Sequence, residues 1–194
     1  DRIKDVIMLA EALQEKKIAE LAEKIASKKD VKMVLIAGPS SSSKTTFAKK
    51  LGLQLKIKGL NPVTIGTDDY FVERSLTPRD ENGEYDFETI DALDLDLFND
   101  HLTKLINGET VNIPTFDFKE GTKRYDDNKK LHLNDDEILV IEGIHCLNDK
   151  LTSKIPKENK FKIYISDLTV LNIDNFNRIS TTDTRLVRRI VRDY

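Results

Sequence analysis

The chain has 194 residues, of which 39% are hydrophobic and 34% charged, a composition typical of a single globular domain. Its 31 basic and 34 acidic residues give a net charge of −3, which excludes a bulk basic surface for nucleic acid or an anionic membrane. One cysteine, scattered histidines, and the absence of a membrane-length apolar run or signal peptide predict a cytoplasmic protein without a disulfide, a zinc site or a membrane partner.

Apolar residues between Ile3 and Ile25 recur at helical spacing, with charged residues between them. The pattern predicts an amphipathic linker helix within residues 1–30, packed on the domain or on a neighbour outside this chain. Residues 31–194 are expected to form the main domain. Because the chain begins without methionine and its last helical pattern reaches Tyr194 without a stop signal, we expect a piece of a longer multidomain chain, truncated at its C-terminus.

Short apolar runs alternate with helical patterns through the rest of the chain. Strands are predicted at residues 33–38, 61–69, 111–118, 137–145 and 160–166, and helices at 44–59, 94–108 and 182–194. This alternation predicts an α/β fold with a doubly wound, mostly parallel sheet, whose ligand site lies at the carboxyl ends of its strands. A small β-hairpin insertion is expected at residues 123–133, with its turn near Asp127 and Asn128.

The stretch GPSSSSKTT, between the first predicted strand and the first helix of the domain, matches the phosphate-loop pattern G-x-x-x-x-G-K-[ST] with one exception. Ser43 stands where glycine precedes the lysine, and if φ is positive there its Cβ costs about 1–2 kcal/mol, enough to weaken nucleotide binding roughly tenfold. In such loops backbone N–H groups surround the phosphates, the lysine contacts the β- and γ-phosphates, and the following hydroxyl binds Mg²⁺. The alternative is a serine-rich helix cap. The residues expected to bind ATP are Gly38, Pro39, Ser40, Ser41, Ser42, Ser43, Lys44, Thr45 and Thr46.

Carboxylates follow two of the predicted strands. Asp68 and Asp69 come at the carboxyl end of the second strand, where phosphoryl transfer needs a group to orient the acceptor hydroxyl. Glu142 ends a run of apolar residues, and an isolated carboxylate there would be costly unless a cation such as Mg²⁺ lies nearby. The alternatives are a solvated turn at the two aspartates and a strand that has already surfaced at Glu142.

Four arginines, Arg185, Arg188, Arg189 and Arg192, fall on one face of the last predicted helix, with Leu186, Ile190, Val187 and Val191 on the other. Four like charges on one face need anions, so the pattern predicts a lid that contacts the triphosphate or the transferring phosphoryl group. A solvated face balanced by neighbouring aspartates is the alternative.

Five segments, GPSSSSKTT, DDYF, IPTFDF, VIEGIH and TTDTRLVRRIVRD, together resemble the uridine kinase/phosphoribulokinase family of P-loop kinases over about residues 33–194. The chain is most similar to bacterial uridine kinase-like proteins in which this domain follows a region like the N-terminal part of threonyl-tRNA synthetase. The resemblance implies ATP and Mg²⁺ as cofactors, with Asp68 as the catalytic aspartate and Thr45, Glu142 and Asp68 near the metal. Catalytic roles are also implied for Lys44, Arg185 and Arg189, and nucleotide contacts for Arg188 and Arg192. The implied contacts of the nucleoside-like acceptor are Asp68, Tyr70, Asp86, Glu88, Phe116, Asp117 and Arg185.

Two positions depart from the family pattern. Ser43 replaces the glycine of the phosphate loop, and Gly121 stands where uridine-cytidine kinases have a base-recognising histidine. The sequence therefore predicts an ATP-dependent phosphotransferase acting on a hydroxyl of a nucleoside-like acceptor. Alternatives are a non-catalytic ATP-binding or scaffold domain, and a nucleotide-dependent switch, although no N-K-x-D guanine-reading sequence is present.

Overall fold

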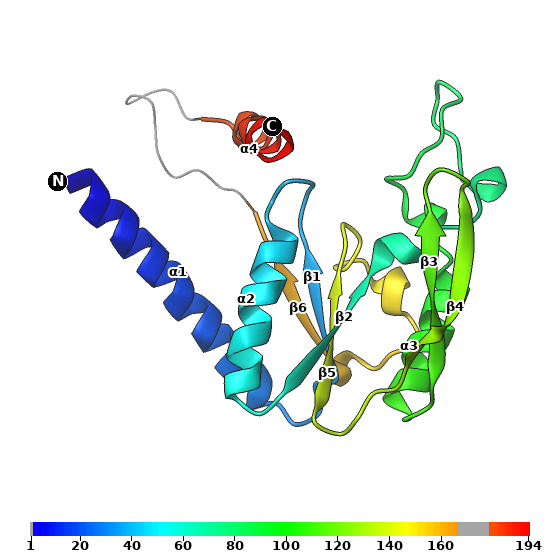
Figure 1. The fold of residues 1–194 in the computed structure, drawn as a ribbon, viewed down its shortest axis with the longest axis horizontal. Coiled ribbons are helices and arrows are strands. Elements are labelled where there is room, and N and C mark those ends of the chain that lie inside the picture. Colours follow the sequence, from blue (N-terminus) through cyan, green and yellow to red (C-terminus); the bar gives the residue numbers. More distant parts are fainter. Residues whose placement is uncertain (1, 167–178) are drawn as a thin grey trace.

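The computed structural model describes residues 2–166 and 179–194. Its main sheet has the strand order β2-β5-β1-β6, and all neighbouring strands are parallel (Figure 1). The strands are β1 (Met33–Ala37), β2 (Asn61–Gly66), β5 (Glu137–Glu142) and β6 (Lys160–Tyr164). The helices are α1 (Arg2–Ala26), α2 (Lys44–Ile57), α3 (Leu95–Ile106) and α4 (Thr181–Asp193). The mostly parallel α/β fold is thus confirmed.

Two hydrophobic cores lie on opposite faces of the sheet, because side chains alternate along each strand. On β1, Met33 and Leu35 belong to the core that α3 covers, whereas Val34 and Ile36 belong to the core that α1 and α2 cover. β5 alternates in the same way. Both faces of these strands are therefore buried, which explains their nearly continuous apolar sequences.

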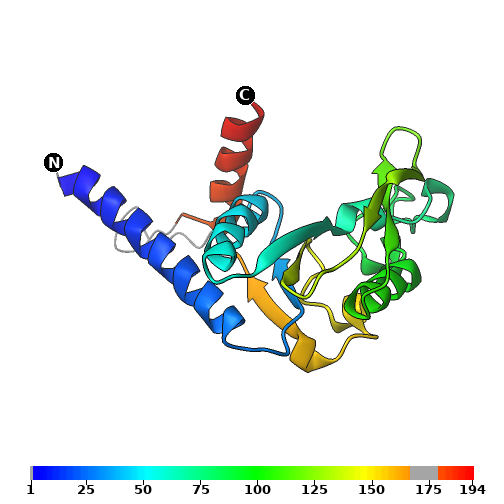
Figure 2. The same ribbon diagram turned by 60° about the horizontal axis from the view of Figure 1, so that its bottom comes forward.

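Helix α1 is anchored to the domain only through its C-terminal half (Figure 2). Ile18, Ala22 and Ile25 are buried against α2 and the sheet, whereas Ile3 is 77% exposed. Ion pairs of Lys50 on α2 and of Lys58, which follows α2, with glutamates of α1 add to this contact. α1 is the longest helix, yet its charges leave no apolar stretch able to cross a membrane, and the same holds for the other helices of residues 2–166 and 179–194.

A β-hairpin insertion exists, but the prediction that it lies within residues 123–133 was wrong, because most of these residues form one strand that pairs with residues 111–117. Strands β3 (Val111–Asp117) and β4 (Thr122–Leu131) pair antiparallel, and the turn that joins them spans residues 118–121. Gly121 ends this turn with φ +73°. The Asp127–Asn128 pair lies inside β4, where the register shifts between Asn112 and Pro114 and leaves an irregularity in the ladder. Turn-forming residues therefore marked a bulge rather than a turn.

The anchoring of α1 can be tested with two matched substitutions in the same helix. We expect Ile18→Ala, at a site only 2% exposed, to lower the free energy of unfolding by about 2–4 kcal/mol, because it opens a cavity between α1 and the sheet. Ile3→Ala serves as the control and should change this free energy by less than about 0.5 kcal/mol. Urea denaturation followed by circular dichroism measures both. Equal losses would contradict the half-anchored arrangement.

Candidate active site

The loop after β1 folds into a tight concave turn. Ser41 and Ser43 both adopt left-handed backbone conformations, with φ of 60° and 70°. Gly38 must lack a side chain, because a Cβ there would lie 2.4 Å from the carbonyl oxygen of Ile165. The positive φ considered for Ser43 is present, and it costs about 1–2 kcal/mol for a residue that carries a Cβ. The backbone thus has the strained, anion-accepting shape of a phosphate loop.

Lys44 is the first residue of α2 and folds back over this loop. Its Nζ donates hydrogen bonds to the carbonyl oxygens of Gly38 at 2.8 Å and Pro39 at 3.1 Å. Partial burial lowers the pKa of Lys44, and the negative charges of Glu142 and Asp68 oppose this shift. The ammonium group therefore lies at the loop mouth with two carboxylates in electrostatic range.

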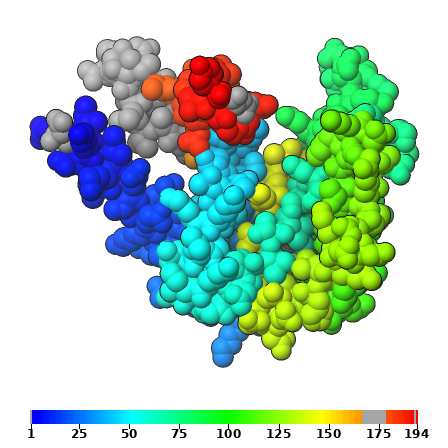
Figure 3. Space-filling view, viewed as in Figure 1, coloured from blue at the N-terminus to red at the C-terminus, as the bar shows by residue number. Residues whose placement is uncertain are grey.

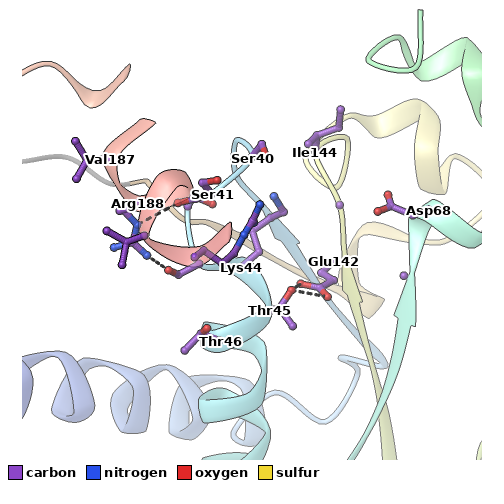
Figure 4. Close-up of a pocket in the computed structure, with 16 residues that line it drawn as sticks. Ser40, Ser41, Lys44, Thr45, Thr46, Asp68, Glu142, Ile144, Val187 and Arg188 are labelled. Carbon is purple, nitrogen blue, oxygen red and sulfur yellow. Dashed lines mark hydrogen bonds between the residues drawn. The ribbon is translucent and has the colours of Figure 1, made fainter. Parts of the chain in front are cut away.

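Thr45 and Glu142 meet across the site from α2 and β5. The Thr45 hydroxyl contacts the two carboxylate oxygens of Glu142 at 3.0 and 2.9 Å (Figure 4). A hydroxyl and a carboxylate are oxygen ligands suited to Mg²⁺, which usually takes one or two carboxylates and completes its shell with water and phosphate oxygens. No group of three or more His, Cys, Asp or Glu side chains within the described ranges forms a protein-only metal cage. This pair of donors fits a metal ion whose other ligands come from water and from the phosphate oxygens of a bound nucleotide.

Asp68 enters the site from the 3₁₀ turn at Thr67–Tyr70, directly after β2. Loss of hydration in the surrounding protein raises the pKa of Asp68, while the positive charge of Lys44 opposes the rise. Its neighbour Asp69 does not line the pocket, and its Oδ1 accepts a hydrogen bond from the backbone N–H of Phe116 at 3.3 Å. The two adjacent carboxylates thus have different surroundings, one at the pocket and one at the β-hairpin.

Helix α4 stands directly on the loop. Arg185 Nε donates to the carbonyl oxygen of Ser40 at 2.8 Å, and Arg188 Nε donates to that of Ser41 at 3.2 Å. Arg188 Nη2 also donates to the Ser43 hydroxyl. These contacts place the arginine-rich helix over the site where phosphates are expected to bind.

The two faces predicted for α4 are not separated as expected. Arg188 and Arg192 line the pocket, but so do Val187 and Val191, which the sequence assigned to the opposite face, while Arg189 does not line it. The side of α4 nearest the pocket therefore lies between the arginine stripe and the valine stripe. The sequence signal for this was present, since each of the two valines directly precedes a pocket arginine.

These residues surround a single pocket of about 760 Å³, a volume suited to a nucleotide (Figure 4). Figure 3 shows the molecular surface hollowed between the side that carries α2 and α4 and the side that carries the β-hairpin. The hydroxyls of Ser41 and Ser42 are buried there and have no hydrogen-bond partner among the described residues. Such groups are expected where oxygen atoms of a ligand or water complete the site. Gly66, Gly143 and Ile144 also line the pocket and were missed by the sequence analysis.

Tyr70, predicted as an acceptor contact, belongs to the core instead. It is 1% exposed, and its hydroxyl shares a hydrogen bond of 3.0 Å with Nδ1 of His101. Burial raises the pKa of this phenol. Its ring packs edge-on against Phe98 on α3, with ring centroids 4.7 Å apart. The tyrosine therefore fixes the 3₁₀ turn that carries Asp68 rather than contacting a ligand.

Asp68 is the one predicted acceptor contact that lines the pocket, whereas the pocket lining does not include Asp86, Glu88, Phe116, Asp117 or Arg185. Phe116 is 5% exposed and packs on Phe71 with ring centroids 5.6 Å apart. Asp117 supports the hairpin turn by accepting from the backbone N–H groups of Lys119 and Glu120 at 2.9 and 3.1 Å, and these bonds lower its pKa.

Asp86 accepts from the backbone N–H groups of Glu88 and Thr89 at 2.9 and 3.2 Å, while Glu88 itself is exposed. Phe116 therefore packs on Phe71, Asp117 supports the hairpin turn, and Asp86 organises its own loop. Contacts of this group with an acceptor stay predictions.

Comparison with known proteins adds an independent result. Residues 33–194 match the model of the phosphoribulokinase/uridine kinase family. The chain belongs to this family. It is 27% identical to the uridine kinase of Halalkalibacterium halodurans over 158 residues, covering 81% of this chain and 65% of that protein. It is 29% identical to the uridine kinase of Mycoplasma genitalium over 162 residues, covering 84% and 67% respectively.

The chain thus spans about two thirds of the length of these two relatives. Among solved structures it resembles a possible uridine kinase from Bacillus stearothermophilus, with a TM-score of 0.59 and 24% identity, covering 91% of this chain and 94% of the other. That likeness concerns the fold, and it agrees with the family assignment.

The close packing of Gly143 against Thr67 can be tested by substituting two glycines that line the pocket. A Cβ added at Gly143 would lie 2.1 Å from Thr67 Oγ1, whereas one at Gly66 would meet nothing within 4 Å. We expect Gly143→Ala to lower the free energy of unfolding by about 1–3 kcal/mol, because Thr67 is buried beside it. Gly66→Ala should leave this free energy unchanged or slightly raised. Thermal denaturation compares the two, and similar values would contradict the packing described.

Proposed function

We propose that this chain transfers the γ-phosphoryl group of ATP to a hydroxyl of a nucleoside-like acceptor. The observation that carries the proposal is the convergence of Lys44, Asp68, Arg188 and the Thr45–Glu142 pair on one pocket at the carboxyl ends of β1, β5 and β2. Family membership supports the same reaction class. In this reaction the acceptor oxygen bonds to the γ-phosphorus, the bond between that phosphorus and the oxygen of ADP breaks, and the hydroxyl proton leaves.

Asp68 takes the role of base for the acceptor proton. Its raised pKa makes the carboxylate a stronger base than an ordinary aspartate, which suits transient proton acceptance. Its position directly after β2 places it across the pocket from the loop residues (Figure 4). The acceptor hydroxyl would then lie between Asp68 and the phosphate held by the loop.

The loop and the lid helix hold the negative charge of the nucleotide. Lys44 exchanges its contacts with the Gly38 and Pro39 carbonyls for β- and γ-phosphate oxygens, and the loop N–H groups bind the same phosphates. Arg185 and Arg188, which already lie on the loop, stabilise charge on the transferring group. Thr45 and Glu142 would hold Mg²⁺, which when bound neutralises charge on the phosphates.

The proposal of a nucleoside-like acceptor is supported by the similarity to uridine kinases, but the hairpin departs from the family pattern at Gly121. Gly121 adopts φ +73°, and a Cβ there would lie 2.6 Å from Cβ of Arg74. Arg74 in turn donates to the carbonyl oxygens of Phe118 and Lys119 and holds the hairpin turn. A histidine at this position would therefore need a rearranged turn, so base recognition in this chain must use other groups.

A panel of acceptors tests the proposal directly. Uridine, cytidine, adenosine, ribose and fructose are each offered with ATP and Mg²⁺, and ADP release is measured with a coupled assay. We expect acceptor-dependent ADP release with at least one nucleoside. If the chain binds ATP but releases no ADP with any acceptor, it is instead the non-catalytic ATP-binding domain. A separate comparison of GTP and ATP binding tests the switch, which tighter binding of GTP would favour.

Replacing Asp68 separates catalysis from nucleotide binding. We expect Asp68→Asn to lower kcat by at least about 100-fold, because the amide cannot accept the acceptor proton, while the Kd for ATP changes by no more than a few-fold. Asp69→Asn is the matched control, since its Oδ1 can still accept from Phe116 N–H and turnover should be largely kept. Steady-state kinetics and calorimetry measure the two quantities. Unchanged turnover in Asp68→Asn would defeat the assignment.

The raised pKa of Asp68 also has a consequence for stability. A carboxyl whose pKa is higher in the folded than in the unfolded state favours folding when it is protonated, and this contribution is lost as the pH rises through the folded-state pKa. Asp68→Asn should therefore have a higher Tm than the parent at neutral pH. The difference should vanish as the pH falls toward the ordinary carboxyl pKa of 3.8. A variant that is less stable at neutral pH would contradict the shift.

Three further expectations remain predictions. A threonyl-tRNA synthetase-like region before α1, a place within a longer multidomain chain, and a cytoplasmic location follow from the sequence resemblance and composition. Only the family-matched residues 33–194 bear on the proposed reaction.

A further inference from the structure

We propose that Ser43 is a positioning residue whose hydroxyl fastens the lid helix α4 to the phosphate loop through Arg188. The inference rests on the proposed function, because it concerns the same nucleotide pocket. It gives a role to the one position where the loop departs from its usual glycine. A glycine would satisfy the backbone conformation without strain, yet it could not accept this hydrogen bond.

The conformation of Ser43 directs its hydroxyl away from its own helix. Ser43 is the N-cap residue of α2, and its side chain makes no capping hydrogen bond. N-cap serines normally accept from the N–H groups of the first helical turn, a geometry that belongs to extended backbone. With φ at 70° and ψ at 28°, the hydroxyl instead accepts from Arg188 Nη2. The left-handed backbone is therefore what makes this oxygen available to α4.

Arg188 is held at two points of the same loop. Its Nε donates to the carbonyl oxygen of Ser41 at 3.2 Å, and its Nη2 donates to the hydroxyl of Ser43. Because the guanidinium is planar and rigid, two contacts from separate nitrogens fix its orientation as well as its position. Arg185, one turn earlier, makes the adjacent contact with the Ser40 carbonyl at 2.8 Å. The helix is thus attached along the loop by successive arginines.

Apolar packing contributes little to holding α4 in place. Leu186, Val187 and Ile190 are each 59% exposed, and Val191 is 73% exposed. A helix with so little buried apolar surface depends on its polar contacts for its position. The hydroxyl of Ser43 is one of the acceptors that hold α4, so its loss is expected to shift the population of the closed lid. The apparent affinity for ATP falls in proportion to that population.

The position of α4 can be measured without nucleotide. Spin labels are attached at Leu53→Cys on α2 and Leu186→Cys on α4, which are 63% and 59% exposed, while the native Cys146 is buried. Double electron–electron resonance then reports the distance between the helices. We expect a single narrow distance for the parent, and a broader or longer distribution for both Ser43→Ala and Ser43→Gly. An unchanged distribution in both variants overturns the proposal.

The paired variants distinguish the hydroxyl from backbone strain. Both lack the hydroxyl, but only alanine keeps a Cβ in the left-handed conformation, so glycine should be the more stable protein while the lid distance shifts equally in the two. Non-additivity gives a second check. The combined shift of Ser43→Ala and Arg188→Met should be smaller than the sum of the two single shifts, because both substitutions remove the same hydrogen bond, whereas Ser43→Ala and Arg185→Met should add, because Arg185 contacts the Ser40 carbonyl instead. Additive shifts with Arg188→Met would contradict the proposed link.

Kinetics connect the link to the reaction. We expect both Ser43 variants to raise KM and Kd for ATP about 2- to 10-fold, because the link acts on lid closure and therefore on the population that binds nucleotide. A loss confined to kcat would overturn the positioning role. Failure of the parent to bind ATP would remove the proposed function, yet the nucleotide-free distance measurement would still decide whether Ser43 fastens the lid.

Discussion

The parallel register of β1, β5 and β2 is the constraint on which the site depends. Glu142 is the register partner of Ile36 on one side and of Gly66 on the other, so the three strands end side by side. The residues that follow each strand then meet at one edge of the sheet. A slip of one residue would turn Glu142 to the other face and reverse the two apolar sets of β5. Burial of apolar side chains on both faces therefore positions the polar groups of the site.

Local features of the site could be predicted from the sequence, and features set by tertiary packing could not. The phosphate loop and the carboxylate after β5 follow from short motifs and apolar runs, so Lys44 and Glu142 were placed correctly at the pocket. Tyr70 was misplaced because the sequence gives no sign that its hydroxyl meets His101. The hairpin turn was misplaced because Asp127 and Asn128 are residue types common in turns, yet both lie within β4. The partner strand β3 ends at Asp117, so the chain has already turned before it reaches them. In both cases a distant partner decided the outcome.

The electrostatics of the pocket oppose its own stability. Burial disfavours the charged forms of both Lys44 and Asp68, and their mutual attraction offsets only part of this effect. A left-handed serine beside them adds backbone strain. Such local conflicts are expected where a site is prepared for a ligand, since phosphate oxygens would give the lysine and the loop better partners than the carbonyl groups they contact without one. The surrounding cores must therefore hold these groups in place.

The adjacent aspartates link the two sides of the pocket. Asp68 lines the pocket, while Asp69 accepts from Phe116 N–H and so joins the end of β2 to the β-hairpin. Tyr70, the next residue, anchors the same turn in the core beside α3. A displacement of the hairpin would therefore act on the turn that carries Asp68 through a single residue. This connection gives a physical route by which a displacement of the hairpin adjusts the position of Asp68, the proposed base, because both contacts belong to one short 3₁₀ turn.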